Sequence, residues 1–199
     1  KGKMPSNTSI TVKEGTLGIA DNAFSGCDGL TSVVIGNSVT SIGYRAFSYC
    51  DGLTSVVIGN SVTSIGEDAF YDCSGLTSIV IGNSVTSIGK NAFRDCTGLT
   101  SIEIPNSVTG IRGGAFYGCS GLTAVHISDL SAWYNIDFGD YSANPFYNAK
   151  NLYLNGKLVT EVVIPEGVKV IRNYAFYNCA WLTSIEIPNS VTSIGKNAF

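Results

Sequence analysis

A 23-residue repeat runs through most of the chain and constrains its fold more than any other feature. The unit 88–110, IGKNAFRDCTGLTSIEIPNSVTG, recurs almost unchanged in steps of 23 residues. Regular units occupy 19–41, 42–64 and 65–87 before it, and one more occupies 171–193. Repeats of this length are typical of solenoids, in which each unit packs only against its neighbours in a stack. The sequence therefore predicts a solenoid.

Each position of the repeat keeps one type of residue. The phenylalanine position contains Phe24, Phe47, Phe70, Phe93, Phe116, Phe176 and Phe199. All six cysteines share a second position, at Cys27, Cys50, Cys73, Cys96, Cys119 and Cys179. A single unit cannot bury these side chains, because apolar burial stabilises only when another apolar layer covers it. We expect the core to form between stacked coils.

Two segments of the unit indicate its local structure. Residues 99–104, LTSIEI, alternate apolar and polar side chains, which predicts a short parallel strand with Ser101 and Glu103 facing solvent. Ala92, Phe93 and Cys96 have the spacing of one helical or 3-10 turn on the opposite wall. With one strand per unit, the chain forms roughly seven to eight coils.

One irregular unit interrupts the repeat between the last two cysteines. Taking Phe146 as its phenylalanine places Ala149 at the cysteine position and leaves two insertions in the unit. The second insertion contains Asn155-Gly156 between alternating apolar residues, which predicts a β-hairpin.

We therefore expect residues 1–199 to form a single solenoid domain. It contains a degenerate, expanded repeat at about 127–170 and a truncated last repeat at 194–199. A coil that ends there would leave Ile187, Val191 and Ile194 uncovered, so we expect this end to be covered by further chain or by end-to-end self-association.

The string CTGLTSIEIPNSVTGIRGGAF resembles the BspA-type leucine-rich repeats of bacterial surface proteins. The stretch LSAWYNIDF followed by NPFYNAKNLYLNGKLVTEVVIPEGV resembles a variant unit of that family. The resemblance implies an α/β, strand-rich, right-handed solenoid with short parallel strands and short helical or 3-10 turns. It also implies an extracellular or cell-surface location, roles in adhesion to host or bacterial surfaces, and no catalytic activity.

The chain departs from the family pattern at a few positions. Ala149 replaces the usual cysteine, and Ala20, Arg112 and Arg172 replace the usual glycine. Because alanine and arginine rarely adopt a left-handed backbone, we expect that this glycine position does not require one.

Composition and charge exclude several classes of partner. The net charge is −3 and the basic residues are scattered singly, so no basic stripe is available for nucleic acid. No apolar run approaches the roughly 20 residues that span a membrane. The first residues, KGKMPSNTSITV, lack the apolar region of a signal peptide, so the location outside the cell is inferred from the resemblance alone.

The polar and sulfur-containing residues do not predict a catalytic, cofactor or metal site. No CxxC pair occurs, and stacked cysteines are better explained as buried free thiols than as disulfides or metal ligands. The repeated asparagine fits a turn that bonds neighbouring coils. The only histidine, His126, lies on an outward strand position without a nucleophile, and Asp129, Asp137 and Asp140 lack a defined spacing.

Two surfaces are candidates for ligand binding. The outward column of the main sheet begins with three valines and continues with Glu103 and His126, although valine also simply suits a strand. In the expanded repeat, aromatic rings beside carboxylates suit sugars or peptides, although Trp133 and Phe138 could instead pack the insertion onto the solenoid. The candidate residues are Val34, Val57, Val80, Glu103, His126, Trp133, Tyr134 and Tyr141.

The sequence favours a non-enzymatic, extracellular or cell-surface binding and adhesion module for a host or bacterial protein or glycan. The alternative is a structural spacer or stalk that presents another domain and binds no ligand itself. An enzyme would need a nucleophile, a base and an orienting group, and the sequence does not place such groups together.

Overall fold

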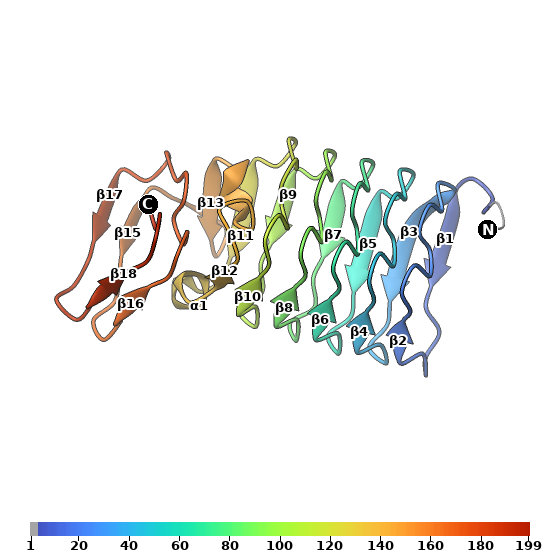
Figure 1. The fold of residues 1–199 in the computed structure, drawn as a ribbon, viewed down its shortest axis with the longest axis horizontal. Coiled ribbons are helices and arrows are strands. Elements are labelled where there is room, and N and C mark those ends of the chain that lie inside the picture. Colours follow the sequence, from blue (N-terminus) through green and yellow to red (C-terminus); the bar gives the residue numbers. More distant parts are fainter. Residues whose placement is uncertain (1–3) are drawn as a thin grey trace.

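The computed structural model describes residues 4–199 as an elongated stack of about eight coils (Figure 1). Each regular coil has three sides: a main strand, a shorter strand and a segment of consecutive turns. The main strands run along the upper part of the view and the short strands along its lower edge (Figure 1). The solenoid prediction is confirmed.

The main wall consists of parallel strands related by the repeat. The first sheet has the order β1-β3-β5-β7, and a typical register pairs Val33 with Val56 and Val56 with Ile79. Its strands are β1 (Thr8–Thr11), β3 (Leu30–Ile35), β5 (Ser55–Ile58) and β7 (Ser78–Val80). The wall continues with β9 (Ser101–Glu103), β11 (Ala124–Ile127), β13 (Asn151–Leu154), β15 (Glu161–Val163) and β17 (Ser184–Glu186).

The second wall is built from two-residue strands. Six of them form one parallel sheet in the order β12-β10-β8-β6-β4-β2, and β16 pairs with β18 in another. Their bounds are β2 (Gly18–Ile19), β4 (Ser41–Ile42), β6 (Ser64–Ile65), β8 (Ser87–Ile88), β10 (Gly110–Ile111), β12 (Asp137–Phe138), β16 (Val170–Ile171) and β18 (Ser193–Ile194).

The phenylalanines of the regular coils before the irregular unit, Phe24 to Phe116, form one stack through the core. Neighbouring ring centroids from Phe24 to Phe116 are 5.1 to 5.5 Å apart, with nearly parallel planes. Phe47, Phe70, Phe93 and Phe116 are fully buried. The prediction that coils bury each other's apolar side chains is confirmed.

The turn wall corrects the prediction of a helical turn around Phe93. Residues two before and two after each regular phenylalanine adopt positive φ, as at Asn91 (53°) and Asp95 (59°). Two left-handed residues within one short segment interrupt a helix, so the chain forms consecutive turns instead. These turns bond along the stack, for example from Phe47 N–H to Ala69 O at 2.8 Å.

The repeated glycine does not adopt a left-handed backbone, which confirms the interpretation drawn from Ala20, Arg112 and Arg172. None of Gly43, Gly66 and Gly89 has a positive φ. Close packing favours glycine there instead: a Cβ atom on Gly66 would lie 2.6 Å from the carbonyl oxygen of Gly43.

Polar side chains bond one coil to the next. The Oδ1 atom of Asn37 accepts a hydrogen bond from the backbone N–H of Asn60 at 2.8 Å, and Asn60 accepts from Asn83 at 3.0 Å. Thr54 donates its hydroxyl to the carbonyl of Thr31 at 3.0 Å. The predicted turn role of the repeated asparagine is confirmed in these coils.

The irregular unit adds the helix α1 (Leu130–Tyr134) and the 3-10 turn η1 (Pro145–Tyr147). Asp129 begins α1 by accepting the N–H of Ser131 at 2.7 Å. The predicted hairpin is confirmed: β13 pairs with the antiparallel β14 (Lys157–Val159) through Asn155 and Gly156, which both have positive φ. Because β14 takes the edge position beside β13, β15 starts a separate sheet with β17.

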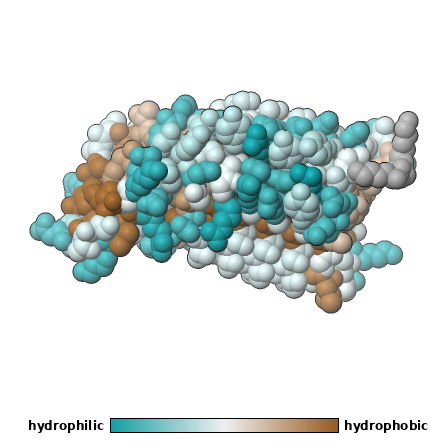
Figure 2. Space-filling view, viewed as in Figure 1, coloured by the Kyte–Doolittle hydropathy of each residue, from teal (hydrophilic) through white to brown (hydrophobic). Residues whose placement is uncertain are grey.

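The C-terminal coils expose more apolar surface than the central ones. Figure 2 shows hydrophobic residues gathered over that end of the molecule, whereas the middle of the same face is mainly hydrophilic or neutral. The exposed residues include Val163, Val170, Ile187, Ile194 and Phe199.

Candidate ligand-binding surfaces

The outward column of the main wall is divided between two sheets. Val34, Val57 and Val80 are exposed on the first sheet, whereas Glu103 and His126 belong to the next one. His126 is half-buried and stacks on Tyr153, with ring centroids 4.8 Å apart. The three valines thus form a short apolar stripe, and the two polar candidates continue the column on the following strands, β9 and β11.

Burial corrects the expectation that Trp133 and Tyr134 contact a ligand. Their side chains are 1% and 2% exposed. The indole ring of Trp133 lies 5.3 Å from Phe146 and 5.4 Å from Phe138, and its Nε1–H donates to the carbonyl of Ala175 at 2.8 Å. The rings of Trp133 and Phe138 join the insertion to the neighbouring coils, in agreement with the alternative that these two residues pack the insertion onto the solenoid.

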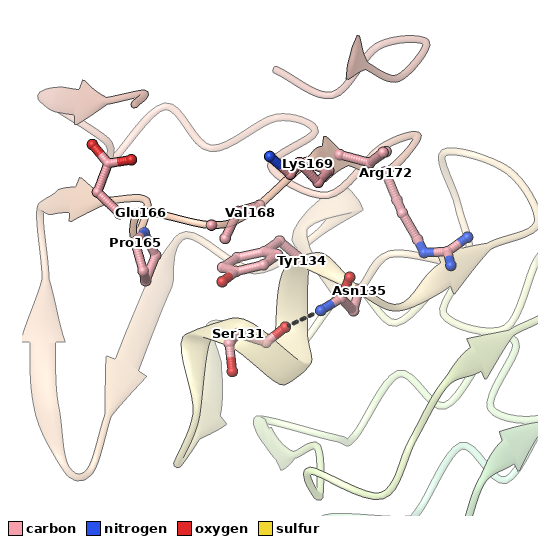
Figure 3. Close-up of a pocket in the computed structure, with 10 residues that line it drawn as sticks. Ser131, Tyr134, Asn135, Pro165, Glu166, Val168, Lys169 and Arg172 are labelled. Carbon is pink, nitrogen blue, oxygen red and sulfur yellow. Dashed lines mark hydrogen bonds between the residues drawn. The ribbon is translucent and has the colours of Figure 1, made fainter. Parts of the chain in front are cut away.

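An open cleft of about 880 Å³ lies between α1 and the turn that leads into β16 (Figure 3). The ring of Tyr134 points toward residues 165–168 across this cleft, and Asn135 donates its side-chain amide to the Ser131 carbonyl at 2.9 Å. Glu166, Lys169 and Arg172 supply charges of both signs around it. The cleft lining includes no histidine or cysteine, and the Ser131 hydroxyl at its edge donates to Asp129 Oδ1 at 2.6 Å, as part of the cap of α1.

The turn wall has a row of tyrosines that follows the stack. We define the tyrosine row as Tyr49, Tyr71, Arg94, Tyr117, Tyr147, Tyr141 and Tyr177. Ring centroids are 5.3 Å apart for Tyr49 and Tyr71, 5.7 Å for Tyr117 and Tyr147, 5.6 Å for Tyr147 and Tyr141, and 5.7 Å for Tyr141 and Tyr177. Tyr49, Tyr117 and Tyr141 are 44%, 39% and 44% exposed.

Arg94 fills the one coil of the row that lacks a tyrosine. Its guanidinium carbon lies 4.7 Å from the ring centroid of Tyr117 and 5.9 Å from that of Tyr71. Its Nε donates to Asp95 Oδ2 at 3.3 Å. The arginine therefore makes cation–π contacts with rings on both sides and is anchored by a carboxylate.

Sequence reasoning identified only Tyr141 of this row as a ligand-binding candidate. The available signal was the position directly after the repeated phenylalanine, which contains Tyr71, Tyr117, Tyr147 and Tyr177. The aromatic rings of separate coils become one surface only when the repeats are stacked in register. Tyr49 lies two residues after its phenylalanine, Phe47, so the pattern of tyrosines directly after phenylalanine does not include it.

Cys50, Cys73, Cys96 and Cys119 are buried free thiols, as the sequence predicted, whereas Cys27 and Cys179 are half-buried. All six are free, and the S–H groups of Cys73, Cys96 and Cys119 donate to phenylalanine carbonyls at 3.0 to 3.1 Å. Burial raises the pKa of the Cys50 thiol to about 11 and that of Cys119 to about 12. Such thiols are poor nucleophiles near neutral pH.

Residues 4–199 contain no group of three or more histidine, cysteine, aspartate or glutamate side chains placed to hold a metal ion. Within the same residues, no helix is long and apolar enough to cross a bilayer.

Comparison with protein families places the repeats in a known group. The family described as "BspA type Leucine rich repeat region" matches residues 17–152 and 147–199, with six copies. A search of curated proteins found no match.

Solved structures with similar folds come from several bacteria. A leucine-rich repeat protein from T. pallidum is 26% identical over 94% of this chain and 72% of that protein, with a TM-score of 0.60. A leucine-rich cell surface protein from Faecalibacterium prausnitzii A2-165 is 28% identical, covering 100% of this chain and 67% of that protein, with a TM-score of 0.55. A leucine-rich repeat protein from Eubacterium ventriosum is 25% identical over 98% and 59%, with a TM-score of 0.59.

Proposed function

Because the chain belongs to the BspA-type leucine-rich repeat family, we propose that it is a binding module that works on a bacterial surface or after secretion. The similar protein from Faecalibacterium prausnitzii is itself described as a cell surface protein, which supports this location. The ligand is a protein or glycan on a host or bacterial surface, and the module is not an enzyme.

The observation that carries the proposal is the exposed tyrosine row. Tyrosine and arginine are enriched in protein interfaces, because they combine a large contact area with a polar group. The row is fixed to a rigid stack, since each coil bonds to the next through its turns. Rigid placement limits the entropy that binding must overcome.

The chemistry of the described residues supports binding rather than catalysis. The single histidine is stacked on Tyr153, and burial raises the pKa of the Cys50 and Cys119 thiols. In the cleft beside α1, the Ser131 hydroxyl donates to the carboxylate of Asp129, which caps the helix, and the lining includes no histidine or cysteine. A repeat protein of this kind binds through the sum of many contacts along its surface.

The test is a binding screen of the intact chain against extracellular matrix proteins, bacterial surface proteins and glycans. We expect the triple variant Tyr117→Ala, Tyr141→Ala and Tyr177→Ala to lose at least about tenfold in affinity, because truncating even one hot-spot tyrosine costs about 2 kcal/mol or more. A matched triple variant on the valine stripe, Val34→Thr, Val57→Thr and Val80→Thr, serves as the control on the main wall.

Circular dichroism would first show that both triple variants keep the fold. Equal affinity of the wild type and the tyrosine variant for every captured ligand would contradict the proposal. A complete lack of binding by the wild type would instead favour the spacer function.

A further inference from the structure

Beside the tyrosine row, one aspartate lacks the arginine partner that the equivalent aspartate of the next coil has. Asp72 and Asp95 occupy the same repeat position, two residues after the buried phenylalanine, and both have positive φ. The carboxylate of Asp95 is paired with Arg94 from its own coil. In the coil of Asp72 the equivalent of that arginine is Tyr71, and within residues 4–199 the Asp72 carboxylate has no ion pair or hydrogen bond.

Nearby carboxylates make an unpaired Asp72 a good site for a cation. Partial burial raises its pKa first, and the negative charges of Asp51 and Asp95 raise it further. Asp51 is exposed and accepts only the Ser74 hydroxyl, at 3.1 Å. A positive charge placed between these carboxylates would therefore relieve their mutual repulsion.

The aromatic rings beside Asp72 could contact the same cation through their faces. Tyr49 and Tyr71 meet edge to face, with an interplanar angle of 68°, and Tyr49 remains exposed. Tyr71 directly precedes Asp72 in the chain, and Tyr49 occupies the repeat position of Asp72 in the preceding coil. Burial raises the pKa of Tyr71, Tyr49, Asp95 and Asp72 raise it further, and Arg94 lowers it. Arg94 is bound by the same types of group, the rings of Tyr71 and Tyr117 and the carboxylate of Asp95.

A second internal arginine repeats the same arrangement. The guanidinium carbon of Arg45 lies 4.9 Å from the ring centroid of Tyr44, and its Nε donates to Asp68 Oδ2 at 3.0 Å. The turn wall thus binds guanidinium groups twice with one combination, a tyrosine ring and a carboxylate. Arginine suits this combination better than lysine, because its planar group both stacks and donates in a fork.

The geometry argues against a sugar as the main occupant of the row. A sugar ring needs an open aromatic face, but Arg94 and Tyr147 lie on either side of Tyr117, at 4.7 and 5.7 Å. The carboxylates beside Tyr49 and Tyr71 favour a cationic group instead.

We propose that Asp72, with the rings of Tyr49 and Tyr71, receives an arginine side chain from an arginine-rich segment of a partner protein. This inference rests on the proposed binding function and specifies the chemistry of the partner. The remaining tyrosines extend the contact along the stack toward Tyr177.

The probe is a fluorescent nona-arginine peptide, with nona-lysine as its charge-matched comparison, titrated by anisotropy at about 0.15 M salt. We expect Asp72→Asn to weaken nona-arginine binding about tenfold, the size typical of losing one charged hydrogen bond. The control Glu103→Gln removes the same charge from the main wall and should change the affinity less than about twofold.

Asp72→Asn should keep the fold, because Asn178 occupies the same repeat position with a φ of 58°. Tyr49→Ala should weaken the peptide as well, whereas Tyr49→Phe keeps the ring and should bind normally. We also expect nona-arginine to bind more tightly than nona-lysine.

Equal losses in Asp72→Asn and Glu103→Gln would overturn the inference, since they would indicate attraction by net charge alone. Equal affinity for nona-arginine and nona-lysine would also overturn the inference. If the triple tyrosine variant loses its ligand in the screen while Asp72→Asn keeps it, this inference fails and the proposed function stands. If the wild type binds nothing in the screen, the proposed function fails.

Discussion

At the scale of single residues, the buried cysteine position shows how the core sets chemical properties. Each thiol lies within the core or at its edge, and its S–H reaches a backbone carbonyl of a neighbouring coil where burial is complete. Because a thiolate would lose its hydration there, burial is the main cause of the raised pKa of Cys50. Ala149 at the same position indicates that the sulfur atom itself is dispensable for packing.

The raised thiol pKa values predict a loss of stability at alkaline pH. The folded state keeps protons that the unfolded state releases above the ordinary thiol pKa of 9.0, so this stability is complete below pH 9 and is lost as pH rises toward 11 to 12. Cys50 alone contributes on the order of 2 kcal/mol. Urea unfolding from pH 8 to 11 measures the decline.

A variant with alanine at Cys50, Cys73, Cys96 and Cys119 isolates the thiols from the titrating tyrosines. It should lose less stability over the same pH range than the wild type does. Parallel curves for the two proteins would contradict the assignment of the decline to the cysteines.

At the scale of the element, two turn types explain what sequence reasoning found and what it missed. Asn155-Gly156 predicts the hairpin between β13 and β14 because both residues tolerate positive φ. The sequence does not reveal the turns around Phe93, because residues that seldom adopt positive φ occupy the equivalent positions in other coils. Arg45, Tyr49 and Tyr174 all have positive φ in the structure. Spacing alone suggested a helical turn, whereas contacts between coils hold these residues in a left-handed backbone.

The hairpin provides a clean test of backbone strain. Gly156 has a φ of 77°, and a Cβ atom added there would meet no heavy atom within 4 Å. Gly156→Ala should therefore lower the free energy of unfolding by about 1 kcal/mol through its backbone alone. Gly110→Ala is the matched control, because Gly110 has no positive φ and serine stands at its position in three earlier units. Chemical denaturation that finds equal effects would refute this explanation.

At the scale of the whole molecule, the repeat predicts the stack and its core, because every coil buries the same side chains against the next. The ligand-binding surface was less accessible to prediction. The outward valines follow directly from strand alternation, but the burial of Trp133 depends on Ala175 and Phe146 from other coils. The tyrosine row likewise arises only when separate units are brought into register.

The tyrosine row is the surface that we expect to contact the ligand. Covalent labelling of tyrosines with mass spectrometry measures this directly, in the free protein and in complex with the ligand captured in the screen. We expect labelling of Tyr49, Tyr117 and Tyr141 to fall in the complex, because these are the most exposed rings of the row. Labelling of Tyr153, which stacks on His126 on the main wall, should stay unchanged. Unchanged labelling of the row, with protection of Tyr153 instead, would contradict this assignment.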